Sequence, residues 1–277
     1  MANGKRAKAA NSSWDAVASW YDALQGEQGS EYHQRIIFPG VARMLSYGRN
    51  DVALQRILDL ACGSGVLCRY LAERGAALTG IDLSEELLQR AKSYPEQGKS
   101  VCYLKADATR LLDEDGKPLY GLDAVTYDAV CLVLAVQNMT SLSSIWRGVA
   151  TLLAPKGILV LVLMHPCFRI PQRSDWRWNE AFGRQERVLW QYLQSEELAI
   201  SIHPGRAAEG ATSETVVHYH RPLQAYVNTL GNAGLLIDHL EEWSSHKREE
   251  PGKKQQALDL ARREFPLFMA LRAKKAE

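Results

Sequence analysis

Between residues 56 and 164, short apolar runs alternate with longer segments whose apolar residues recur every three or four positions. The short runs predict buried strands, and the longer segments predict helices that pack on a sheet by one face. The strands are expected over residues 56–60, 77–82, 101–105, 127–135 and 158–164. The helices are expected over 65–74, from Ser84 onward, and around 142–152. Strands that alternate with helices indicate an α/β fold with a parallel sheet and right-handed crossovers.

The segments on either side of this repeat have other patterns. Apolar residues at helical spacing predict two helices, 14–21 and 33–45, before the sheet. Residues 166–220 break the rhythm with three of the seven tryptophans, many arginines, and two alternating stretches, 197–202 and 213–220, that could pair as a hairpin. We expect this insertion to serve as a lid, and to be more mobile than the sheet because it has little core of its own.

The pattern then returns for the last sixty residues. Pro222 and Gly234 bracket a predicted helix. A strand over 235–240, a charged loop over 244–256 and a strand over 266–272 are expected to follow. The organisation is therefore a flexible tail, 1–13, and one domain, 14–277. That domain divides into a core of about 50–165, the insertion of about 166–220 and a C-terminal part, 221–277.

Chemistry is concentrated where the predicted strands end. Residues 57–65 read Ile-Leu-Asp-Leu-Ala-Cys-Gly-Ser-Gly, a buried strand that runs into a glycine-bearing turn and then a helix. Gly63 and Gly65 let the backbone approach a ligand where a Cβ would clash. Asp82 ends the second strand, and Asp107-Ala108 follows the third. Ligands of open α/β sheets bind outside the carboxyl ends of the strands, so these three loops are expected to face one nucleoside.

This set of motifs resembles the class I S-adenosylmethionine-dependent methyltransferases over about residues 53–165 and again over 220–275. The resemblance implies a doubly wound, mostly parallel, seven-stranded Rossmann-like sheet with an antiparallel edge strand. It also implies S-adenosyl-L-methionine as cofactor, with the methionine end at Asp59 and the 61–65 turn, the ribose at Asp82, and the adenine amino edge at Asp107-Ala108. Ala61 departs from the pattern, since many members carry glycine there.

Aromatic and apolar side chains complete the cofactor site implied by the resemblance. Tyr21 and Tyr32 belong to an opening segment that resembles those folding over the cofactor in small-molecule methyltransferases, and a ring there can face the sulfonium. Leu83 and Leu134 complete the set.

Two other nucleotide-binding sites also use a glycine-rich first turn. A nicotinamide or flavin site needs a small third residue in G-x-G-x-x-G, but Cys68 or Val66 stands at that position. A phosphate-binding P-loop requires G-x-x-x-x-G-K-[ST], which does not occur in the chain.

The methyl acceptor is expected beside the ends of the fourth and fifth strands. His165 follows the fifth strand and is the candidate general base, while Arg169 could neutralise an acidic acceptor. The remaining substrate candidates are His33, Gln137, Asn138 and His220. His165, His218 and His220 could together bind zinc, but no nearby acid or cysteine completes a ligand set, and no metal is expected.

Composition narrows the function classes. A net charge of +1 provides no broad basic field for nucleic acid or anionic lipid, and no apolar run approaches membrane length. Five cysteines without a C-x-x-C pair indicate reduced thiols in a cytoplasmic protein. The prediction is a cytoplasmic S-adenosylmethionine-dependent methyltransferase, monomer or homodimer, that acts on an O, N or C atom of a small molecule.

Two alternatives stay open. One is a tRNA or rRNA methyltransferase that grips phosphates with arginines of the insertion, namely Arg173, Arg177, Arg184 and Arg187. The other is a non-catalytic S-adenosylmethionine-binding protein without an acceptor channel.

Overall fold

The computed structural model describes residues 14–15, 18–47, 55–95, 98, 100–124, 126–201 and 215–276. The tail predicted over 1–13 lies outside these residues, as do parts of the stretches predicted over 14–21, 197–202 and 213–220.

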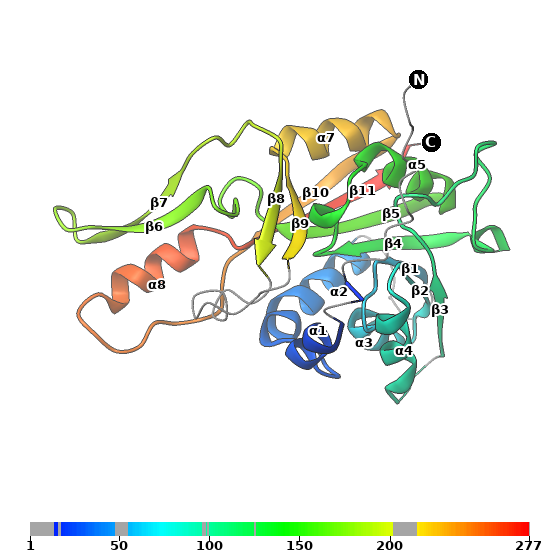
Figure 1. The fold of residues 1–277 in the computed structure, drawn as a ribbon, viewed down its shortest axis with the longest axis horizontal. Coiled ribbons are helices and arrows are strands. Elements are labelled where there is room, and N and C mark those ends of the chain that lie inside the picture. Colours follow the sequence, from blue (N-terminus) through cyan, green and yellow to red (C-terminus); the bar gives the residue numbers. More distant parts are fainter. Residues whose placement is uncertain are drawn as a thin grey trace, which may run out of the picture.

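A seven-stranded sheet forms the centre of the molecule, with the order β10-β11-β5-β4-β1-β2-β3 (Figure 1). Its strands are β1 Arg56–Leu60, β2 Ala77–Asp82, β3 Val101–Lys105, β4 Tyr127–Val133, β5 Leu153–Met164, β10 Leu235–Trp243 and β11 Phe268–Lys275. Strands β1 to β5 pair in parallel, whereas β11 runs antiparallel between β5 and the edge strand β10. The mostly parallel sheet expected from the sequence is therefore confirmed. The antiparallel strand is the inner member of the edge hairpin.

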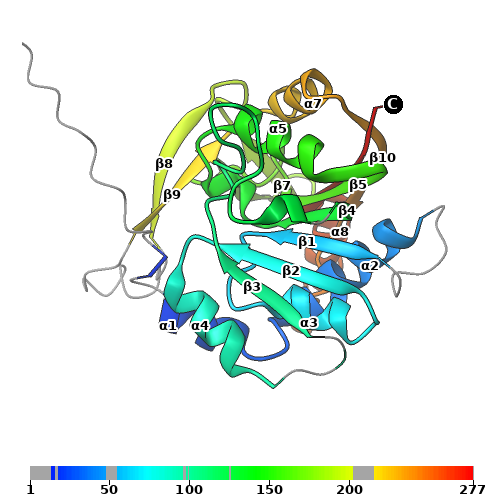
Figure 2. The same cartoon turned by 90° about the vertical axis from the view of Figure 1, so that its right-hand side faces the viewer.

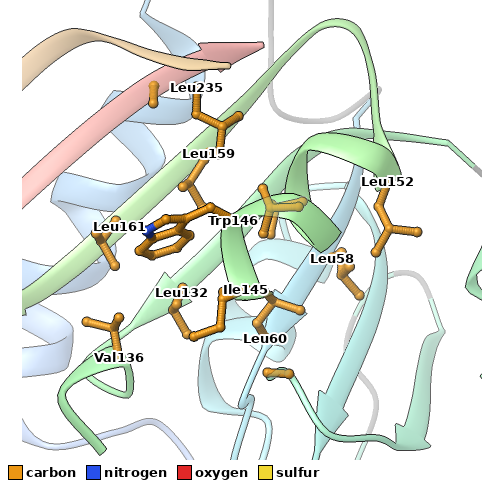
Figure 3. Close-up of a cluster of buried hydrophobic side chains, with 14 of the residues drawn as sticks. Leu58, Leu60, Leu132, Val136, Ile145, Trp146, Leu152, Leu159, Leu161 and Leu235 are labelled. Atoms are coloured by element: carbon orange, nitrogen blue, oxygen red, sulfur yellow. The ribbon is translucent and has the colours of Figure 1, made fainter. Parts of the chain in front are cut away.

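Helices cover both faces of the sheet, as Figure 2 shows. The face with α5 Leu142–Leu152 and α7 Leu223–Asn232 buries Trp146, whose indole N–H donates to Thr229 Oγ1 at 3.0 Å (Figure 3). The other face carries α2 Phe38–Ser46, α3 Val66–Ala72 and α4 Glu85–Ser93. Adjacent strand residues alternate between the two cores, with Ile57 in one and Leu58 in the other. Burial on both faces explains why the strands read as continuous apolar runs.

The N-terminal helices differ in detail from the prediction. Helix α1 covers Ala18–Gln25, and the helix expected over 33–45 begins as a π-helical turn, His33–Ile37, before α2. Pro39 stands near the start of α2 and has no backbone N–H to donate to the preceding turn. A wide turn directly before this proline accommodates the missing hydrogen bond.

The insertion consists of two antiparallel ribbons. Strands β8 Glu196–Ser201 and β9 Thr215–His220 form the hairpin that the alternating stretches predicted. The ribbon of β6 Ser174–Asn179 and β7 Arg184–Leu189 was not predicted, and neither was helix α8 Gln255–Glu264 in the C-terminal part. Both missed elements are only half-buried, so neither carries a strong apolar pattern. They lie beside each other at one end of the molecule (Figure 1).

Short 3₁₀ turns complete the described structure, η3 Leu122–Ala124 and η4 Val136–Asn138. Among the described helices, none combines the length and apolar character needed to cross a bilayer.

Candidate active site

A cavity of about 480 Å³ opens where β1, β2, β3 and β4 end. This is the carboxyl edge of the parallel strands, where α/β folds bind their ligands. Its walls come from all four loops, from the N-terminal segment and from the β8–β9 hairpin. The residues that line it are Trp14, Tyr21, Ala61, Gly63, Asp82, Leu83, Leu87, Ala106, Asp107, Ala108, Thr109, Val133, Leu134, Ala135, Asn138, Met139, Thr140, Val217 and Tyr219.

The turn after β1 has a left-handed backbone at three positions. Ala61, Gly63 and Gly65 have φ values of 55°, 56° and 77°. A Cβ on Gly65 would lie 2.3 Å from the hydroxyl of Tyr103, so only glycine fits there. Ala61 adopts a backbone conformation that glycine takes at no steric cost but that strains a residue with a Cβ. The alanine that stands where many family members carry glycine is therefore strained.

Asp82 links the first two loops of the cavity. One carboxylate oxygen accepts the N–H of Gly63 at 2.9 Å, and the other accepts the N–H of Ser84 at 2.8 Å. Burial raises the pKa of Asp82, while these backbone hydrogen bonds oppose the rise. The side chain lines the cavity, so it can also accept ribose hydroxyls.

Asp107 is fixed by its own turn. Its Oδ1 accepts the N–H of Thr109 at 2.8 Å and the hydroxyl of Thr109 at 2.7 Å. Within the described residues, no donor is recorded for Oδ2. This oxygen is suited to an exocyclic amine, with Ala108 next to it on the cavity wall.

Asp59 lies behind the turn, outside the cavity lining. It is buried and accepts the thiol of Cys68 at 3.2 Å, and burial raises its pKa to about 7. Gly65 likewise shapes the turn without lining the cavity. In this geometry both residues support the backbone that faces the ligand.

Two aromatic rings of the N-terminal segment close one side. Tyr21 lines the cavity and meets Trp14 edge to face, with 5.4 Å between ring centroids. Burial and the charge of Asp82 raise the pKa of Tyr21 to about 12, so its hydroxyl stays protonated. Tyr32 lies elsewhere, with its hydroxyl 3.2 Å from that of Ser245 and its ring against Phe268.

The opposite wall joins β4 to the β8–β9 hairpin. Leu134 follows β4 with a φ of 55°, a second left-handed non-glycine residue on the cavity. Asn138 donates from Nδ2 to the carbonyl of Val217 at 2.7 Å and so holds the hairpin against η4. Val217 and Tyr219 line the cavity, whereas the intervening His218 is buried on the other face of β9.

The sequence did not single out Trp14, Thr109, Val217 or Tyr219. The alternation over 213–220 is the signal that could have found the hairpin pair. His218 and His220 occupy the buried face, so Val217 and Tyr219, which alternate with them, must face the opposite way.

His165 does not line this cavity. Its Nδ1 accepts the N–H of Cys167 at 3.2 Å, so Nε2 carries the hydrogen and donates to Glu242 at 2.7 Å. Burial lowers the pKa of His165 more than the neighbouring carboxylate raises it. With both ring nitrogens occupied, the imidazole cannot accept a substrate proton in this arrangement, contrary to the role expected from its position after β5.

The other substrate candidates are dispersed, and of these only Asn138 reaches the cavity. His33 is buried 2.8 Å from the hydroxyl of Ser30, and Gln137 donates to the carbonyl of Leu134 at 2.9 Å. His220 donates from Nε2 to the carbonyl of Tyr192 at 2.8 Å. Among the described side chains, no three His, Cys, Asp or Glu are grouped to hold a metal ion. Arg169 lines a separate cavity, described below.

Comparisons with known proteins agree with this geometry. Residues 58–161 match the family described as a methyltransferase domain. YqeM of Bacillus subtilis (strain 168), a methyltransferase by name, is 30% identical over 196 residues, which cover 66% of this chain and 74% of that protein. The ubiquinone biosynthesis O-methyltransferase of Caulobacter sp. (strain K31) is 30% identical over 119 residues, but the match spans less than half of either chain, 43% and 44%.

A solved S-adenosylmethionine-dependent methyltransferase from Mesorhizobium loti has the same fold, with a TM-score of 0.60 and 28% identity. The match covers 86% of this chain and 99% of that one. The order of the strands, the glycine-bearing first turn and the acidic residues of the loops are those of the class I S-adenosylmethionine-dependent methyltransferases. The chain belongs to this methyltransferase family, and its cofactor is S-adenosyl-L-methionine.

Proposed function

We propose that this methyltransferase acts on a small molecule, and that the acceptor approaches past Leu134, Asn138 and Tyr219. The observation that carries the proposal is the shape of the 480 Å³ cavity. Its two carboxylates, Asp82 and Asp107, stand at the ends of β2 and β3, whereas none of the described charged side chains lines it after β4, where Leu134 and Met139 lie beside Asn138. Such a site suits a nucleoside at one end and a compact organic acceptor at the other. The matched relative from Caulobacter is named for ubiquinone biosynthesis, which also supports a small-molecule acceptor.

Different residues of the cavity bind different parts of the cofactor. Asp82 and Asp107 supply acceptors for the ribose hydroxyls and the adenine amine, and the left-handed turn from Ala61 to Gly65 brings backbone groups to the methionine end. When bound, S-adenosylmethionine supplies a methyl group on a positively charged sulfur, an activated leaving group. The task left to the protein is to align the acceptor with that bond and to exclude water. Tyr21 and the β8–β9 hairpin cover the cavity for this purpose.

The arginines of the insertion argue against an RNA substrate. Arg173 forms an ion pair with Glu196, and Arg184 pairs with Glu186 at 2.9 Å. Arg187 is half-buried and donates to the carbonyl of Phe168. Of the four arginines considered for an RNA substrate, only Arg177 and Arg184 are exposed, and two exposed cations are few for tracking phosphates.

The test is transfer of labelled methyl from S-adenosylmethionine into cell extract separated into RNA and metabolite fractions. We expect label in the metabolite fraction, and none with an Asp82→Ala control. Label in RNA alone would replace the proposal with the RNA alternative, and no label in either fraction would favour a non-catalytic binding protein. We further propose a monomer or homodimer in the cytoplasm, and the five free cysteines, three of which are buried, support the cytoplasmic location.

A further inference from the structure

A second cavity, of about 340 Å³, lies between the β6–β7 ribbon, α8 and the N-terminal segment. We call it the arginine pocket. Its walls include Trp176 of β6, Gln185 of β7, Arg262 of α8, and Tyr32 and Arg169. In Figure 1 the ribbon and α8 lie beside each other at the end of the molecule toward which β5 runs.

The arginine pocket opens on the same edge of the sheet as the cofactor cavity. Leu267 lines it, and the carbonyl of Leu267 accepts the N–H of His165 at 2.9 Å, directly after β5. Phe268 pairs with Met164 in the sheet, and β5 is the neighbour of β4, which leads to Leu134. Because β11 is antiparallel, its start lies at this edge, two strand spacings or about 10 Å from the end of β4.

The charge in the arginine pocket is unbalanced. Arg262 forms an ion pair with Glu249, whereas Arg169 donates to two backbone carbonyls, those of Phe265 at 3.1 Å and Pro266 at 3.3 Å. Among the described residues, no carboxylate lies within 4.0 Å of Arg169 or Arg187, and no acceptor is recorded for Nη1 of Arg169. Burial and the neighbouring Arg187 lower the pKa of Arg169 to about 10. A half-buried cation with only neutral partners is a site where an anion is favoured.

The walls favour a flat ring. The guanidinium carbons of Arg169 and Arg187 lie 5.3 Å and 4.9 Å from the ring centroid of Trp176. The ring of Phe265 contacts the same indole in a T-shaped arrangement, with 5.4 Å between the ring centroids. Tyr32 adds a second aromatic wall, and aromatic surfaces of this kind accept planar apolar groups.

We infer that the arginine pocket anchors the methyl acceptor, and that this acceptor carries a carboxylate or phosphate next to a planar apolar ring, on the β11 side of the methylated atom. The inference rests on the proposed function. Arg169 would bind the anion through Nη1, and Trp176 would pack on the ring. The arrangement selects anionic acceptors, because a neutral analogue leaves the guanidinium without a charged partner.

The test measures binding of three probes by calorimetry with saturating S-adenosylhomocysteine. The probes are 2-naphthoate, 2-naphthyl phosphate and the neutral 2-naphthol. We expect at least one of the two anions to bind about tenfold more tightly than 2-naphthol, since charged hydrogen bonds are roughly twice as strong as neutral ones. The two anionic probes distinguish a carboxylate from a phosphate acceptor.

Three variants localise the binding. Arg169→Gln removes the cation, and Gln185→Glu adds an anion to the wall at a side chain for which the described structure records no hydrogen bond. Both are expected to weaken anion binding about tenfold and to leave 2-naphthol unchanged. Arg177→Gln is the matched control, because Arg177 is exposed and adjacent to Trp176 on the ribbon. The affinity of this variant for the anions should stay within about twofold of that of the wild type. If Arg169→Gln does not fold, Gln185→Glu decides the question.

Several results would overturn the inference. They are equal binding of 2-naphthol, no anion binding at concentrations up to about 5 mM, an equal effect of Arg177→Gln, and competition between the anions and S-adenosylhomocysteine, which would place the probe in the cofactor cavity. Failure of the proposed function is distinguishable, because it would appear as absent methyl transfer to metabolites while the anions still bind at Arg169.

Discussion

The two cavities of the carboxyl edge are built in different ways. Around the cofactor cavity, the two carboxylates are held by near neighbours, since Asp82 accepts from Ser84 and Asp107 accepts from Thr109, each two positions away. Around the arginine pocket, contacts join distant segments, as Tyr32 meets Ser245 across 213 positions and Arg169 reaches Pro266 across 97. The acidic groups of the cofactor cavity are therefore positioned by single turns, whereas the arginine pocket exists only when the C-terminal part has docked. We expect the cofactor cavity to tolerate changes in the arginine pocket, and the experiments below test whether the two cavities are independent.

The largest effect is expected at Asp82. Asp82→Ala removes a charged acceptor for two ribose hydroxyls and the clamp on Gly63 and Ser84. At about 1.5–3 kcal/mol per charged hydrogen bond, affinity for S-adenosylhomocysteine should fall by about 10² or more. Calorimetry measures this, with Asp115→Ala at an exposed turn as control. Wild-type affinity in the Asp82 variant would refute its assigned role.

His165→Ala should act on folding rather than on cofactor binding. The side chain is 3% exposed and joins Glu242 of β10 to the end of β5. Its loss should cost about 2–4 kcal/mol and lower Tm by about 5–10 °C. At low temperature, affinity for S-adenosylhomocysteine should stay within about threefold of wild type. A variant with normal Tm whose turnover falls 10²-fold would instead restore His165 as the general base.

The free energy of unfolding should fall in acid, because buried neutral histidines resist protonation in the folded protein. Burial lowers the pKa of both His33 and His218 from 6.5 to about 4. As pH falls below 6.5, the unfolded chain binds protons before the folded chain does, so stability is lost between about pH 6.5 and 4, by up to about 3 kcal/mol per histidine. Asp59, whose folded pKa is raised to about 7, opposes this trend over the same range.

The histidine contribution is isolated by comparing wild type with His218→Gln in urea titrations from pH 7 to pH 4. The variant should lose less stability on acidification. An identical pH dependence in the two proteins would show that His218 is not buried as a neutral ring.

A smaller effect is expected where the β8–β9 hairpin meets the cofactor side. Asn138→Ala removes the hydrogen bond to the carbonyl of Val217, worth about 1 kcal/mol. Amide hydrogen exchange in β9 should then quicken about fivefold, while exchange in β6 and β7 stays unchanged. Faster exchange in both ribbons would mean that the insertion opens as one unit.

The smallest effect is expected at Ala61. Ala61→Gly removes the strain of a left-handed alanine, worth about 1–2 kcal/mol. The substitution also raises the conformational entropy of the unfolded chain, which lowers the free energy of unfolding by a similar amount. We expect Tm to change by no more than about 3 °C. Ala61→Val, in contrast, should lower it clearly, because a β-branched residue resists positive φ. Equal stability of the glycine and valine variants would mean that the turn relaxes to another conformation.

The sheet and its cofactor loops could be predicted from the sequence because their determinants are local. The apolar run of β1, the glycines at 63 and 65, and the acids at 82 and 107 each stand at the end of a strand, and parallel strands bring those ends together. The mostly parallel seven-stranded sheet with an antiparallel edge strand followed from the resemblance to a known family, and the structure confirms it.

The acceptor side was decided by tertiary structure. His165 occupies a loop position typical of catalytic residues, yet Glu242, 77 positions away, takes up its N–H. The sequence suggested Arg169 as a partner for an acidic acceptor, but the pocket around it is formed by Trp176, α8 and the β6–β7 ribbon, and neither of those two elements was visible as a pattern. Periodicity reports which face of an element is buried, and turn residues report backbone conformation. Neither reports which distant side chain becomes the partner of a polar group, because that pairing exists only once the chain has folded.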